Sequence, residues 1–132
     1  MNTKYLMVAS SVVLGLAGLA ASFAPVELLN SLNVATTEPL PVLIQLLGAL
    51  YLGFALMNWT AKGFVVGGIY SRPLTIGNTI HFTVGAIALL KHQFTHDVDG
   101  PLIVASILYT GFAICFGYLV FGRGAACATN PK

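Results

Sequence analysis

Apolar residues fall into four long runs along the chain of 132 residues, and the polar residues gather between them. Each run is close to the ~20 residues that a helix needs to cross a hydrocarbon core of about 30 Å. Prolines open or precede the later runs, where a missing N–H has no intrahelical partner to lose. The pattern predicts four transmembrane helices, approximately over residues 5–24, 42–59, 74–90 and 102–121.

The composition supports a membrane location. Hydrophobic residues make up 57% of the chain and charged residues only 8%, against about 25% charged in soluble domains. The length suits a single domain, residues 1–132, so we predict an all-α, integral membrane four-helix bundle. A net charge of +2 without a basic patch argues against binding nucleic acid.

Basic residues lie mainly on one side of the predicted helices. Lys91 is the only one on the opposite side, and the acidic residues all fall in the two loops of that side. The remaining basic residues are Lys4, Lys62, Arg72, Arg123 and Lys132. Because cytoplasmic segments are rich in Lys and Arg, we predict cytoplasmic N and C termini in a multi-pass protein of the cytoplasmic (inner) membrane.

The first apolar run has features of a secretory signal, with a lysine before it and small residues near its end. It is longer than a usual signal core, so we expect a retained anchor. The outer loop over residues 25–41 follows. Within it, Val26, Leu29 and Leu32 predict a short amphipathic helix at the membrane surface.

Two stripes of small residues indicate where helices pack, because close approach holds helices together in lipid. In the first helix the stripe is Ser11, Gly15, Gly18 and Ser22, and in the fourth it is Ser106, Thr110, Ala113 and Gly117. Both have spacings of four, three and four, which keep the stripe on one face and suit left-handed crossings.

His81 is the strongest candidate for chemistry, because an ionisable group within a span is costly and marks a functional hypothesis. It lies eight residues beyond Pro73, about 12 Å into the membrane. Asn78 is one turn earlier on the same face, and Asn58 on the second helix could approach both. With Arg72 these residues form a predicted polar cluster that opens toward the cytoplasm.

Three interpretations of this cluster stay open. Its members could hydrogen-bond one another and fix the helix register, which is the interpretation we favour. They could instead bind a polar headgroup, a quinone or a similar ligand, or take part in a metal or haem site. Bis-histidine haem ligation needs a second intramembrane histidine on a facing helix, and the sequence offers none.

A second candidate site lies in the outer loop after the third helix. If that helix continues one turn past the membrane, His92 and His96 share a face at spacing i, i+4, which lets two imidazoles hold one metal. Asp97 or Asp99 could add an oxygen ligand. The alternative is that both histidines are simply solvated.

The arrangement resembles the DoxX-like family of small four-helix membrane proteins. The likeness rests on a glycine-rich first helix that closes on a proline (Gly15 to Pro25), a polar outer loop, and a second helix reading LGALYLGFA over residues 47–55. Some members are subunits of quinone-linked oxidoreductases, so the resemblance implies membership in a respiratory assembly. The chain lacks a CxxC pair, which departs from a redox-active pattern.

These features predict a non-catalytic membrane protein, an accessory or scaffold subunit of a larger membrane complex, and the resemblance implies that this complex is respiratory. No nucleophile–base pair is evident, and no acidic residue falls within a predicted span. Its expected partners are the lipid bilayer and other membrane subunits or further copies of itself. The alternatives are a carrier of a quinone or lipid at the His81 cluster and a metal-handling protein. The sequence identifies no cofactor.

Overall fold

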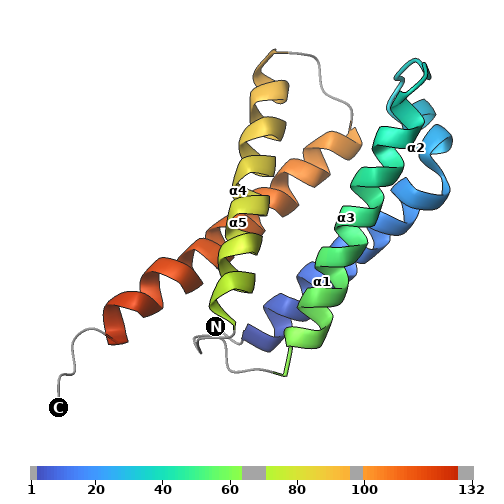
Figure 1. Ribbon diagram of the computed structural model, residues 1–132. Coiled ribbons are helices and arrows are strands. Elements are labelled where there is room, and N and C mark those ends of the chain that lie inside the picture. Colours follow the sequence, from blue (N-terminus) through green and yellow to red (C-terminus); the bar gives the residue numbers. More distant parts are fainter. Residues whose placement is uncertain (1–2, 64–70, 96–99, 128–132) are drawn as a thin grey trace. The chain divides into compact units, whose positions relative to one another are not determined.

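The computed structural model is all-helical over the residues that it describes, 3–63, 71–95 and 100–127, with side chains described as far as residue 122 (Figure 1). The long helices are α1 (Thr3–Phe23), α3 (Leu40–Ala61), α4 (Arg72–Thr95) and α5 (Gly100–Cys127). A short helix, α2 (Pro25–Ser31), follows α1. The four predicted long helices are confirmed.

The four long helices are each long and apolar enough to cross a membrane. They provide spans of 21, 22, 24 and 23 residues, and 20 residues of α-helix already cover about 30 Å. Many large apolar side chains on them are exposed, including Leu16, Leu56 and Ile114 at 65%, 65% and 68%. Surfaces of this kind belong in lipid, and the chain is a multi-pass membrane protein.

The third long helix extends further than the end of its apolar run suggested. The prediction ended it at Leu90, whereas α4 continues to Thr95 and carries Lys91 and His92 in its last turns. The charge at Lys91 ends the apolar run, but it does not end the helix, because lysine, glutamine and histidine are compatible with helical backbone geometry.

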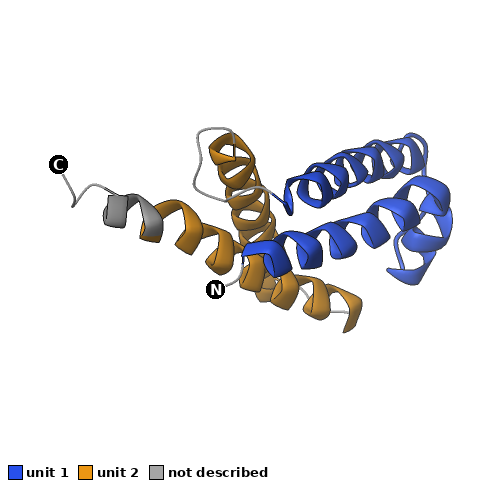
Figure 2. Cartoon of the chain, turned by 90° about the horizontal axis from the view of Figure 1, so that it is seen from below, with its two compact units in different colours: residues 1–63 blue, residues 64–132 orange. Residues whose placement is uncertain are grey.

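The chain divides into two compact units, residues 1–63 and 64–132 (Figure 2). Each unit is built on a pair of long helices that are adjacent in the sequence and packed together, α1 with α3 and α4 with α5.

In the first unit, α1 and α3 pack closely enough for their backbones to meet. A Cβ atom added at Gly18 would lie 2.9 Å from the carbonyl oxygen of Gly48, and one added at Gly48 would lie 2.7 Å from the backbone nitrogen of Ser22. Ser11 donates a hydrogen bond of 2.7 Å to the carbonyl oxygen of Ala55. The small-residue stripe predicted on the first helix therefore forms the contact with α3.

The short helix α2 closes the end of this pair at which α1 ends and α3 begins (Figure 1). Pro25 and Leu29 are buried against the neighbouring helices, while Val26 is 40% exposed. The predicted short helix in this loop is present, and its position at the membrane surface stays a prediction.

In the second unit, aromatic rings from both helices lie in the contact between α4 and α5. Phe82 is fully buried and stacks on Phe116, with ring centroids 5.6 Å apart and an interplanar angle of 9°. Phe112 lies 4.8 Å from the same ring. A Cβ at Gly85 would lie 2.5 Å from the ring of Tyr109.

Within the second unit, the small-residue stripe predicted on the fourth helix meets α4 only in part. Ser106 is buried and bonded across the pair, but a Cβ added at Gly117 would meet nothing within 4 Å. The rings of Phe112 and Phe116 give more dispersion contact than small side chains can, so they set the face that α5 turns toward α4.

We predict that Gly48→Ala destabilises the α1/α3 pair by roughly 1–3 kcal/mol, since the added methyl group forces two backbones apart. Thermal unfolding in detergent measures the effect. Gly53→Ala is the matched control. Gly53 lies on the same helix as Gly48, and a Cβ added there would meet nothing within 4 Å. Equal melting temperatures for the two variants would contradict the close contact.

Candidate functional site

Asn58 lies in the first unit, fully buried on α3. Its side-chain nitrogen Nδ2 donates to Ser10 Oγ at 3.0 Å, and that hydroxyl donates to the carbonyl oxygen of Met7 at 3.0 Å. Ser10 and Met7 are themselves fully buried. A polar side chain in hydrocarbon needs such partners, so Asn58 helps to fix the register of α1 against α3.

Asn78 and His81 lie in the second unit, one turn apart on α4. Asn78 is fully buried, and its Nδ2 donates to the carbonyl oxygen of Leu74 at 2.9 Å, one turn earlier on its own helix. The shared face of Asn78 and His81, and their joint role in a ligand site, stay predictions. The approach of Asn58 to these two residues stays a prediction.

The imidazole of His81 lies beside the phenol of Tyr109 on α5. His81 Nε2 is 3.4 Å from Tyr109 Oη, and the ring centroids are 5.6 Å apart. Phe82 closes one side, with its ring centroid 5.2 Å from each of the other two rings. His81 is half-buried, so it is neither sealed in the core nor fully open.

This pairing gives α4 and α5 a polar point within an otherwise apolar contact. An imidazole nitrogen and a phenol hydroxyl can each donate or accept a hydrogen bond. Together they can bind a carbonyl or hydroxyl oxygen of a ligand whose remaining surface is apolar.

Tyr109 was not among the residues expected at this site. The sequence does contain a signal for it: Tyr109 lies eight residues after Pro101, as His81 lies eight residues after Pro73. Both are thus polar-tipped rings well inside a predicted span. Which faces of the two helices meet, however, depends on packing that the spacing does not give.

Arg72 is exposed at the first residue of α4. It precedes His81 by nine residues, which corresponds to about 13 Å along the helix axis. The two residues thus mark different depths of the same helix, one at its end and one in its interior. A shared role in one ligand site stays a prediction.

The proposed metal site falls only partly within the described residues. His92 is exposed on α4, which does continue past the apolar run as that site required. His96, Asp97 and Asp99 lie outside the described residues. Among the residues that the structure describes, no three His, Cys, Asp or Glu side chains gather where they could hold a metal ion.

Gln93, next to His92, makes a contact between helices that the sequence did not reveal. Its Nε2 donates to Ser106 Oγ on α5 at 2.5 Å and lies 3.3 Å from the carbonyl oxygen of Leu102. Ser106 Oγ also donates to the carbonyl oxygen of Leu102 at 2.9 Å. This polar contact joins the end of α4 to the start of α5.

Comparison with protein-family models, curated proteins and solved structures finds no match for this chain.

The Asn58–Ser10 hydrogen bond can be measured by a double-mutant cycle. We expect Asn58→Ala and Ser10→Ala to be coupled by about 0.6–1.7 kcal/mol, the range of interhelical hydrogen bonds in membrane proteins. Unfolding by sodium dodecyl sulfate in mixed micelles gives the free energies. Thr60→Ala, which removes an exposed hydroxyl bonded within its own helix, is the control and should show no coupling with Ser10. Strictly additive effects of the first pair would contradict the bond.

Proposed function

We propose that the chain is a non-catalytic accessory or scaffold subunit of a larger membrane complex. The observation that carries this proposal is the different placement of polar and apolar side chains. The polar groups Ser11, Asn58 and Gln93 bond to neighbouring helices of their own unit, whereas the exposed faces of the long helices are apolar.

Exposed glycines support the proposal. Gly53 on α3 and Gly111 on α5 lie within the spans, and a Cβ at either would meet nothing within 4 Å. Helices in lipid associate where small residues let backbones approach, because lipid tails are as apolar as leucine and give no hydrophobic drive. An exposed glycine within a span is suited to such an approach.

Cytoplasmic termini, an inner-membrane location and a DoxX-like relationship belong to the same proposal. The charge asymmetry supports the orientation, since Lys91 alone lies opposite the other basic residues. The family resemblance supports a place beside a quinone-linked oxidoreductase.

Purification from the native membrane in mild detergent tests the accessory role. We expect other membrane subunits to be retained with the chain and to be identified by mass spectrometry. Gly53→Leu should weaken that retention about tenfold, equivalent to a loss of about 1.4 kcal/mol, while the chain stays folded because the site is open. Recovery of the wild-type chain alone, from membranes in which it is expressed at its natural level, would contradict the proposal.

A second candidate function is the binding of a small oxygen-bearing ligand, and the His81–Tyr109 pair is the observation that favours it. The two polar tips lie within an aromatic contact, where the apolar part of a quinone or lipid ester would find complementary surface.

If the ligand binds at this pair, substitutions of the two residues should lower its affinity by different amounts. With a short-chain quinone as the probe, Tyr109→Phe removes only a hydroxyl and should weaken binding about tenfold, the equivalent of one hydrogen bond to an uncharged group. His81→Ala should weaken it further. His92→Ala, on the exposed last turns of α4, is the control. Unchanged quinone affinity in Tyr109→Phe and His81→Ala, both folded by circular dichroism, would exclude the pair as the site.

A further inference from the structure

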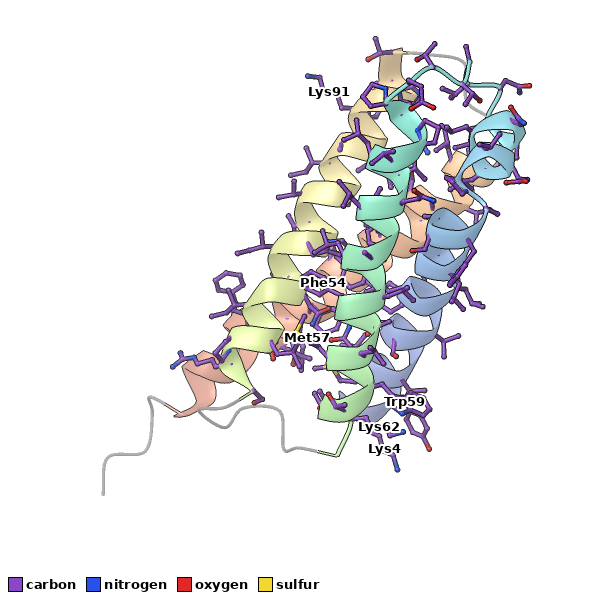
Figure 3. All side chains as sticks on the ribbon, turned by 45° about the vertical axis from the view of Figure 1, so that its right-hand side comes forward. Lys4, Phe54, Met57, Trp59, Lys62 and Lys91 are labelled. Carbon is purple, nitrogen blue, oxygen red and sulfur yellow. The ribbon has the colours of Figure 1, made fainter. Side chains whose placement is uncertain are left out.

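The contact between α1 and α3 continues into a pair of lysines at one end of the first unit. The Ser11–Ala55 hydrogen bond and the glycine contact farther along are seven residues apart on each helix. Continuing by the same step in the other direction leads from Ser11 to Lys4 and from Ala55 to Lys62. Seven residues are close to two helical turns, so both lysines continue the line of contact at the same level. Figure 3 shows both at this end of the pair.

The carboxylates of the first unit lie far from this end of the helix pair. The first turn of α1 contains no acidic residue, and Lys4 adds a cation where the helix dipole is already positive. Within residues 1–63, the acidic side chains are Glu27 and Glu38. Both lie beyond the other end of α1, a helix length of about 30 Å away. Two cations on facing helices favour an anion between them.

Trp59 fixes the position of one of these cations. The Nζ atom of Lys62 lies 3.1 Å from the centroid of the Trp59 ring, a cation–π contact. Trp59 is 46% exposed, and tryptophan rings in membrane proteins favour the headgroup level. Tyr5, 71% exposed, follows Lys4 on α1 and has the same preference. The ammonium group of Lys62 is thus held at the depth where lipid phosphates lie.

We propose that Lys4, Lys62 and Trp59 form a binding site for the phosphate of an anionic lipid headgroup. Two ammonium groups can bracket one phosphodiester anion, and the indole ring holds one of them in place. A zwitterionic headgroup would bring its own cation toward these lysines, so the site distinguishes phosphatidylglycerol from phosphatidylcholine. The inference depends on membrane residence alone, not on the accessory role.

The chain supplies its own probe, because Trp59 is its single tryptophan. The full-length protein is reconstituted in phosphatidylcholine nanodiscs, and tryptophan fluorescence is followed as brominated phosphatidylglycerol or brominated phosphatidylcholine is added. We expect the anionic lipid to quench at a lower mole fraction. Lys4→Gln and Lys62→Gln should each reduce this preference about fivefold, the contribution of one lysine near an anionic surface.

Lys91→Gln is the matched control, since it removes an equal charge from an exposed position on α4 and should leave the preference unchanged. Three outcomes would overturn the proposal. Both brominated lipids could quench Trp59 equally, or Lys91→Gln could reduce the preference as much as the other two variants. In the third, millimolar inorganic phosphate would displace the anionic lipid, which would assign the lysines to a free anion instead.

Discussion

The whole structure depends on how two helices can be held together when the medium around them is as apolar as their own side chains. Each helix satisfies its own backbone hydrogen bonds, so only close contact and a few side-chain bonds remain to join a pair. The first unit uses contact between glycines, Gly18 against Gly48, and adds the bonds of Ser11 and Asn58. The second unit uses stacked rings around Phe82.

The four long helices could be predicted because length and apolar content alone decide whether a segment can span a bilayer. The contact face of the first helix could be predicted as well, since serine and glycine at helical spacing permit the closest approach. The corresponding face of the fourth helix could not. There Phe112 and Phe116 determine the packing through a ring on α4, and nothing in the spacing of α5 indicates which partner faces it.

The same limit applies to the candidate site. His81 stands out in the sequence because an imidazole within a span is unusual, but its neighbour Tyr109 depends on how α4 and α5 are rotated about their axes. Gln93 also bonds across these helices to Ser106, which the small-residue stripe had placed at a helix contact without indicating this partner. Among the described residues, one of these polar contacts lies near the middle of the pair and the other near its connecting end. Of the first contact, only the histidine was expected.

The packing partners of each unit are neighbours in the chain, which has a consequence for biogenesis. Every residue of the α1/α3 contact has been synthesised once residue 63 leaves the ribosome. The first unit can thus close its glycine contact and bury Asn58 while α4 is still unmade. Membrane insertion can then proceed one helical hairpin at a time, with each hairpin shielding its own polar groups from lipid.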